Sequence, residues 1–320
     1  MAEREMEVLH ICPANFATGG TESIHQLVQE LNRNDNIYAK ILYVHWDGKQ
    51  CPQPKEYEHY GCPYITEFPE GFKGCVIFPE VYGNEAIEEK YKDCVVAMNW
   101  AGVDVYDWNV PEDKRGVYLQ RPDMIHIARS EYAVDYLTKK GLKNIKVECT
   151  VADEFFNPYV EVVRHDMVLY NAVVFKMTQF QKDVMQRCEE KYHIVFQPII
   201  GLTRREVMQL MYTNKLYIDF GEFSGRERLP REACLCGCCV ITSRTGAAGY
   251  FADVAVPDEY KFTENQVEQA VDKIQYVLTN YKKCRPDFDV YRQSLEHDKQ
   301  VYSEQVKELC DEILSHSTNI

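Results

Sequence analysis

A glycine pair near the N-terminus is the first place where residue type and position together suggest chemistry. Gly19 and Gly20 follow an apolar run over residues 8–12 and directly precede residues 21–31, in which apolar side chains recur at helical spacing. Glycine lets backbone N–H groups approach a phosphate or a sugar closely, and the first turn of a helix favours negative charge. The loop is therefore a candidate anion or sugar site, although the same glycines can serve the turn alone.

A cluster of four cysteines raises the question of a metal site. Cys234, Cys236, Cys238 and Cys239 form a CxCxCC pattern, which lacks the paired CxxC knuckles that bind zinc. The chain has 13 cysteines, and many lie in apolar segments, where a free thiol behaves as a small hydrophobe. We expect reduced cysteines in the core, no bound metal and no other cofactor.

The segments that would position these residues alternate between strand and helix patterns. Strands are predicted at residues 8–12, 39–46, 75–78, 94–99, 125–130 and 145–149, with helices at 21–31 and 131–140. The alternation restarts with strands at 167–170, 193–197, 216–220 and 239–242 and helices at 178–192, 203–212 and 267–278. Alternation of this kind favours parallel sheets covered by helices.

The length of the chain agrees with two domains. At 320 residues it exceeds one ordinary doubly wound domain. Residues 151–164 mix acidic and aromatic residues with a proline and show no periodicity, so we place a linker there. We predict a Rossmann-like domain over residues 1–152, a second over 153–295, and a C-terminal helix over 296–320 that can pack back on the first domain.

The composition restricts partners and location. The formal net charge is -14, which would repel a phosphate backbone, so nucleic acid is not an expected partner. No apolar run approaches the roughly 20 residues that span a bilayer, and the charged start MAEREMEVLHIC is unlike a signal peptide. We therefore predict a cytoplasmic protein without a transmembrane segment, and the oligomeric state stays open.

One long segment resembles a known family. Residues 219–243, DFGEFSGRERLPREACLCGCCVITS, and the following Thr245-Gly-Ala-Ala are similar to the donor-binding segment of family 4-like glycosyltransferases (glycosyl transferases group 1). Gly19-Gly20-Thr21-Glu22 resembles their GG-x-E loop. The resemblance, to a divergent member, implies the α/β GT-B fold, with two Rossmann-like domains whose parallel sheets face across a cleft. The first domain would be the acceptor side, and the second would bind the nucleotide-sugar donor.

The resemblance also implies roles for individual residues. Glu232 would hold the donor ribose hydroxyls, and Pro230 at a first helical position would place Glu232 in the first turn. Lys176 would neutralise a diphosphate leaving group, and Arg226 or Arg228 would replace a lost arginine charge. We predict two catalytic residues, Lys176 and Arg228. The predicted donor-binding residues are Gly19, Gly20, Asn171, Arg226, Glu227, Glu232, Gly246 and Ala247.

The chain departs from the family pattern at three points. Ser224 stands near the place of an expected glutamate, which Glu222 or Glu227 could replace, and Asn171 stands where the family has an arginine. The usual acceptor-domain histidine has no counterpart, because the corresponding strand ends in Asn99 and Trp100. His126 lies inside a predicted strand and is expected to be a core histidine.

The resemblance implies a metal-independent, hexosyltransferase-type enzyme that retains the anomeric configuration. It would move a sugar from a nucleotide-diphosphate sugar, such as a UDP- or GDP-sugar, to a hydroxyl of a sugar or other acceptor. One alternative is a catalytically inactive sugar or nucleotide-sugar binding protein of the same fold. Another is a DNA-base glycosyltransferase, which would need a basic groove. The sequence does not name the sugar, the nucleotide or the acceptor.

Overall fold

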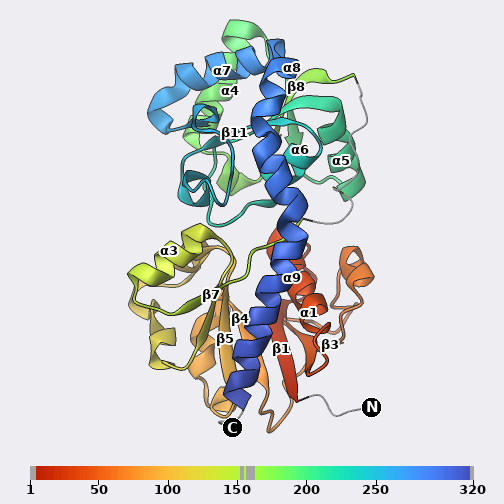
Figure 1. Ribbon diagram of the computed structural model, residues 1–320, viewed down its shortest axis with the longest axis vertical. Coiled ribbons are helices and arrows are strands. Elements are labelled where there is room, and N and C mark those ends of the chain that lie inside the picture. Colours follow the sequence, from red (N-terminus) through yellow and green to blue (C-terminus); the bar gives the residue numbers. More distant parts are fainter. Residues whose placement is uncertain (1–4, 152–154, 156–162, 318–320) are drawn as a thin grey trace. The chain divides into compact units, whose positions relative to one another are not determined.

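The computed structural model describes residues 5–151, 155 and 163–317, and the chain divides into two compact units (Figure 1). Unit 1 comprises Met1–Thr150 and Gln300–Ile320, and unit 2 comprises Val151–Lys299. The sequence placed the corresponding divisions after residues 152 and 295. Most of the linker predicted at 151–164 lies outside the described residues.

Unit 1 is built on a parallel sheet whose described strands run in the order β3-β2-β1-β4-β5-β6-β7. Near-continuous apolar runs suit this arrangement, because helices cover both faces of a parallel sheet. The order reverses between β1 and β4, which are hydrogen-bonded neighbours. The strands are β1 (Met6–Pro13), β2 (Ile37–Val44), β3 (Tyr64–Ile65), β4 (Cys75–Pro79), β5 (Val95–Trp100), β6 (Ile125–Ala128) and β7 (Asn144–Lys146).

Helices pack on both faces of this sheet. One face carries a core that joins α1 to the C-terminal part of α9, including Leu27 and Leu309, and the other face carries an aromatic core around Trp100. The α-helices are α1 (Gly19–Leu31), α2 (Val103–Asn109), α3 (Glu131–Lys139) and the C-terminal part of α9 (Asp289–Ser317). The 3-10 helices are η1 (Lys55–Tyr60), η2 (Glu80–Ile87), η3 (Glu89–Tyr91), η4 (Glu112–Lys114) and η5 (Val117–Gln120).

Unit 2 repeats the α/β plan with a parallel sheet in the order β12-β11-β10-β8-β9. Its strands are β8 (His165–Asn171), β9 (Phe196–Ile199), β10 (Asn214–Asp219), β11 (Cys239–Ser243) and β12 (Lys261–Phe262). Its α-helices are α4 (Gln179–Tyr192), α5 (Arg204–Thr213), α6 (Arg228–Leu235), α7 (Val267–Thr279), α8 (Tyr281–Cys284) and the start of α9. Its 3-10 helices are η7 (Val174–Lys176), η8 (Gly246–Gly249), η9 (Asp258–Tyr260), η10 (Glu264–Gln266) and η11 (Arg285–Phe288).

Several predicted boundaries differ from the structure, as at α6 and β9. Helix α6 begins at Arg228, so Pro230 is its third residue and Glu232 lies beyond the first turn. Proline is tolerated there because the amides of the first turn have no intrahelical partner in any case. The strand predicted at 193–197 instead spans Phe196–Ile199 as β9, because His193 takes a left-handed φ of 56° that ends α4.

Two predictions about buried side chains are confirmed. His126 is buried and accepts a hydrogen bond from Trp100 Nε1 (3.1 Å), and burial lowers its pKa to about 4, so it is a neutral core histidine. The four thiols of the CxCxCC cluster are free and buried, with Cys234 in α6, Cys239 in β11, and Cys236 and Cys238 in the connection between them. None of the described helices has both the length and the apolar character to cross a bilayer.

Candidate functional site

The strand order reverses between β8 and β10 in the sheet of unit 2. In open α/β sheets, ligands bind outside the carboxyl ends of the strands at such a switch point. Strand β8 ends at Asn171 and is followed by Lys176, while β10 ends at Asp219 and is followed by Gly221. The predicted residue Lys176 is thus carried to the switch point of its own unit.

Lys176 is fully buried, and its ammonium group is surrounded by acceptors. Its Nζ donates a hydrogen bond to the carbonyl oxygen of Glu222 and lies 3.4 Å from Glu227 Oε1 and 3.8 Å from Asp219 Oδ2. The ammonium also lies 4.3 Å from the centroid of the Phe223 ring. A buried lysine needs counter-charge of this kind to remain charged.

Asp219 is a second buried ionisable residue at this point and was not predicted from the sequence. Its Oδ1 accepts a hydrogen bond from the amide of Gly221 (3.0 Å), and its Oδ2 accepts one from the Tyr217 hydroxyl (3.1 Å). Burial raises the pKa of the Asp219 carboxyl, and the ammonium of Lys176 opposes that rise. An acidic residue at the carboxyl end of an apolar strand was the signal that could have identified it.

Gly221 explains how Lys176 can lie so close to the end of β10. A Cβ at this position would lie 2.5 Å from Lys176 Cδ and 2.9 Å from its Cα, closer than real contacts allow. The helix that follows Lys176 is fixed to the same strand end, because the buried Gln181 side chain accepts a hydrogen bond from the Phe220 amide (2.8 Å). Because a Cβ at position 221 would clash with Lys176, packing requires glycine there.

The start of α6 brings a second cation and a second carboxylate to this region. Arg228 is the first residue of α6, and its Nε lies 2.9 Å from Oε1 of Glu232, one turn further along the helix. The Arg228 side chain is 37% exposed, whereas that of Glu232 is 1% exposed. Arg228 is therefore the more exposed member of this ion pair.

Arg226 serves the packing of the loop before α6. Its Nη2 lies 3.2 Å and 3.3 Å from the two carboxylate oxygens of Asp298 on α9. Arg231 approaches the same carboxylate, with Nη1 3.9 Å from Asp298 Oδ2, and donates a hydrogen bond to the Arg226 carbonyl (3.1 Å). From the sequence, the positive charge of Arg226 was predicted to bind the nucleotide-sugar donor. In the structure this charge lies in a buried ion pair that anchors residues 221–228.

The remaining predicted residues of unit 2 lie in two turns. Asn171 ends β8, and its Oδ1 accepts a hydrogen bond from the Val173 amide (3.2 Å), which shapes the following turn. Gly246 has a left-handed φ of 49°, and the amide of Ala247 donates to the Phe223 carbonyl (2.8 Å). The Gly246 turn is therefore hydrogen-bonded to the loop that contacts Lys176.

A buried lysine stabilises the turn at Gly246 through hydrogen bonds to backbone carbonyls. Lys261 is 3% exposed, and its Nζ donates hydrogen bonds to the carbonyls of Ala248 and Val254, each at 2.7 Å. Burial lowers its pKa to about 8. Lys261 was not predicted from the sequence, because nothing in the local pattern around it distinguishes it from a surface lysine.

In unit 1 the corresponding switch point lies between β1 and β4, and the glycine pair follows β1. Thr18 is the N-cap of α1, where its hydroxyl accepts a hydrogen bond from the Thr21 amide (3.3 Å). Gly19 and Gly20 are exposed in the first turn. A Cβ at Gly20 would have Thr18 Oγ1 as its nearest neighbour, at an ordinary contact distance of 3.8 Å. Packing within the unit therefore does not require glycine at position 20.

Strand β4 brings a buried carboxylate to the same edge. Glu80 accepts hydrogen bonds from the amides of Gly102 (3.1 Å) and Ala101 (3.3 Å), which fixes the start of α2. Burial raises the pKa of Glu80 to about 7. Nearby, Arg129 is fully buried after β6, and its Nη1 and Nη2 have no hydrogen-bond partner among the described residues. Neither residue was predicted from the sequence.

The structure thus brings four of the predicted residues into one region of unit 2, where two cations face two carboxylates: Lys176, Arg228, Glu227 and Glu232. Cations at a switch point can stabilise negative charge that develops on a phosphate. Among the described residues, no group of three or more His, Cys, Asp or Glu side chains could hold a metal ion.

Two doubly wound units of this kind define the GT-B fold, and solved structures agree. The chain is similar to sucrose-phosphate synthase from Thermosynechococcus elongatus, with a TM-score of 0.73, 13% identity, and coverage of 97% of this chain and 99% of that one. It is also similar to TarM, with a TM-score of 0.72, 8% identity, and coverage of 97% and 98%.

A third similar structure is an alpha-glucosyltransferase in complex with UDP and a 13-mer DNA. The TM-score is 0.58 and the identity 10%, with coverage of 98% of this chain and 100% of that one. The sequence matches no protein-family model and no curated protein. At these identities the likeness is one of fold, and the chain has the fold of GT-B glycosyltransferases.

Proposed function

We propose that this protein is a retaining, metal-independent glycosyltransferase that moves a sugar from a nucleotide-diphosphate sugar to an acceptor hydroxyl. The observation that carries the proposal is the placement of Lys176 and Arg228 at the switch point of unit 2. The fold shared with glycosyltransferases supports it. The donor would bind to unit 2, with Glu232 accepting hydrogen bonds from the ribose hydroxyls.

The chemical demand of this reaction is stabilisation of a leaving group. A bond forms between the acceptor oxygen and the anomeric carbon, while the bond from that carbon to the diphosphate oxygen breaks and leaves its electron pair on the diphosphate. The acceptor proton passes to a departing phosphate oxygen. Lys176, Arg228 and backbone N–H groups near Gly246 are of the type that stabilises this charge, so side-chain cations rather than a metal ion would do so.

A bound donor would have to compete with carboxylates already present. The Lys176 ammonium lies 3.4 Å from Glu227, whose side chain is 26% exposed, and 3.8 Å from the buried Asp219. We infer that Glu227 moves aside when a diphosphate approaches, because it is the more exposed of the two carboxylates. Asp219 would stay and hold the lysine side chain in place.

The ion pairs of Lys176 with Asp219 and Glu227 favour a second candidate, a binding protein without turnover. If the ion pairs of Lys176 persist with a ligand bound, its charge is not available for a leaving group. Ser224 and Asn171, which stand where the family has a glutamate and an arginine, would weaken the donor site further. A DNA-base glycosyltransferase is not proposed, since the net charge of -14 opposes a duplex.

The test is a screen of the full chain against UDP-, GDP-, ADP- and CMP-sugars that reads thermal stabilisation and release of free nucleotide. Lys176→Ala is expected to lower nucleotide release by about a hundredfold, the scale for loss of one group that stabilises developing charge. The matched control is Lys182→Ala, an exposed lysine on α4. A chelator is expected to leave turnover unchanged.

The outcomes separate the candidates. Stabilisation with release that Lys176→Ala abolishes supports the transferase. Stabilisation without release, even with sugar acceptors present, supports the binding protein. If none of the nucleotide sugars stabilises the chain, the donor site in unit 2 is wrong.

A further inference from the structure

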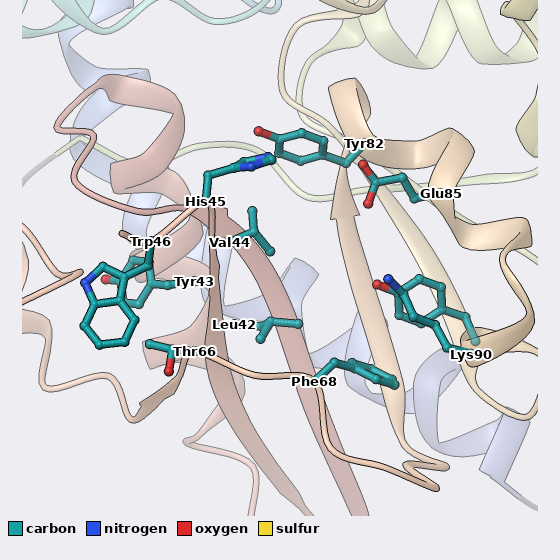
Figure 2. Close-up of a pocket in the computed structure, with 11 residues that line it drawn as sticks. Leu42, Tyr43, Val44, His45, Trp46, Thr66, Phe68, Tyr82, Glu85 and Lys90 are labelled. Carbon is teal, nitrogen blue, oxygen red and sulfur yellow. The ribbon is translucent and has the colours of Figure 1, made fainter. Parts of the chain in front are cut away.

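Unit 1 contains a pocket of about 340 Å³ beside the carboxyl end of β2, whereas most of the predicted donor residues belong to unit 2. Three segments line it, namely β2 with the two residues after it, the segment after β3, and η2 with η3 (Figure 2). The volume lies in the range of small-molecule sites. The lining residues are Leu42, Tyr43, Val44, His45, Trp46, Thr66, Phe68, Tyr82, Glu85, Lys90 and Tyr91.

The base of the pocket is apolar and buried. Leu42 and Tyr91 are 3% and 2% exposed, and Phe68 packs edge-on against Tyr91 with ring centroids 4.9 Å apart. At the other end, the His45 ring lies 5.7 Å from that of Tyr82 (Figure 2). Aromatic rings that keep one face open are suited to contact the C–H face of a ligand.

The polar groups sit beside this aromatic base. Figure 2 shows the half-buried Glu85 carboxylate extending from η2 toward Val44 and His45. The Lys90 ammonium lies 2.9 Å from Glu88 and 4.8 Å from the Tyr91 ring centroid, so its charge is balanced locally. The pocket therefore combines hydrogen-bonding groups with little net positive charge, which disfavours a phosphate or a nucleic acid.

The backbone at the mouth of the pocket is strained and lies next to the glycine loop. His45 adopts a left-handed φ of 60°, which is uncommon for a residue other than glycine and recurs at functional sites. The residue before it, Val44, accepts a hydrogen bond from the Ala14 amide (2.9 Å), in the loop that leads to Gly19 and Gly20. A ligand in the pocket would thus end beside the switch point of unit 1.

We propose that this pocket binds one neutral sugar ring of a carbohydrate acceptor. This ring would neighbour the sugar residue of the acceptor to which the new sugar is transferred. A pyranose has a C–H face for Phe68 and Tyr82 and hydroxyl groups for Glu85 and His45, whereas an aliphatic ligand would leave these polar groups unsatisfied. The acceptor role rests on the proposed function. The binding of a sugar does not, because it depends on unit 1 alone.

The test measures the binding of free sugars to the full chain in the absence of nucleotide, by saturation-transfer NMR and by titration. The probes are glucose, galactose, mannose, N-acetylglucosamine and their common disaccharides. Glu85→Gln, which keeps the shape of the side chain, is expected to weaken binding by about tenfold or more, the scale for one hydrogen bond to a charged group. Tyr82→Leu removes an aromatic face and is expected to weaken binding by about threefold to tenfold, the scale for one aromatic contact. Trp108→Leu is the matched control, since Trp108 is 55% exposed on α2 and lies outside the pocket.

The outcomes are separate from those of the donor screen. Saturable binding that falls in both pocket variants and persists in Trp108→Leu supports the pocket, even if no nucleotide sugar binds and the proposed function fails. Binding that is unaffected by both pocket variants places the sugar elsewhere and overturns the proposal. Absence of binding by every sugar tested overturns it too, while the donor screen can still succeed.

Discussion

Replacing Asp298 by alanine is expected to lower the free energy of unfolding by about 3–5 kcal/mol, the cost of removing one partner of a buried ion pair. The carboxylate lies 3.2 Å from Arg226 Nη2 and 3.9 Å from Arg231 Nη1. The three residues are 3–7% exposed, so solvent cannot replace the lost counter-charge. The two guanidinium groups would also repel each other more strongly.

A double-mutant cycle measures how much of this cost belongs to the ion pair. Arg226→Met fills a similar volume without the charge, so the double variant Arg226→Met/Asp298→Ala is expected to cost about 1–3 kcal/mol less than the sum of the two single changes. The assay is urea denaturation of the full chain followed by circular dichroism. The control is Lys143→Ala, which breaks the exposed 3.0 Å pair with Glu312 on the same helix and is expected to cost about 1 kcal/mol or less.

Two results would refute this reasoning. A loss below about 1 kcal/mol in Asp298→Ala would mean that other groups already compensate the two arginines. Strict additivity in the cycle would mean that Arg226 and Asp298 stabilise the unit independently and that the pair does not anchor residues 221–228.

Two further predictions concern the switch point of unit 1. Burial raises the pKa of Glu80 from 4.5 to about 7, so the unfolded chain releases this proton at lower pH than the folded chain does, and stability falls as pH rises from 4.5 to 7. In urea denaturation, the free energy of unfolding of Glu80→Gln relative to that of the wild type is therefore expected to rise by about 3 kcal/mol over that range. A difference between the two proteins that does not change with pH would contradict the raised pKa of Glu80. Gly20→Ala is expected to leave the free energy of unfolding unchanged or raise it by up to about 1 kcal/mol, because alanine suits a helix and finds open space there. The same change is expected to reduce thermal stabilisation by a nucleotide sugar, and unchanged stabilisation would show that the glycine serves the turn alone.

Much of the fold could be predicted from local sequence patterns. The helix expected at 178–192 is α4 (Gln179–Tyr192), and the strand expected at 239–242 is β11 (Cys239–Ser243). Apolar periodicity and capping residues act over a few positions, so the chain itself displays them. Boundaries that depend on one backbone angle, such as that at His193, leave no such pattern.

The candidate site was only partly predictable. The family resemblance selected Lys176, Glu227 and Arg228, which the structure brings into one region. It also selected Arg226, and nothing in the neighbouring sequence indicates that a carboxylate 72 residues further on would pair with it. The roles in catalysis and donor binding stay predictions for all of these residues.

The sequence by itself determined the alternation of strands and helices, the glycine loop and the positions of the arginines around the start of α6, because these depend on neighbouring residues. Only the tertiary structure decided which charges are compensated. The burial of Lys176 between Asp219 and Glu227, the pairing of Arg226 with Asp298 and the aromatic pocket beside β2 join segments far apart in the chain. Ion pairs and pockets depend on distances and desolvation in three dimensions, and local periodicity carries no information about either.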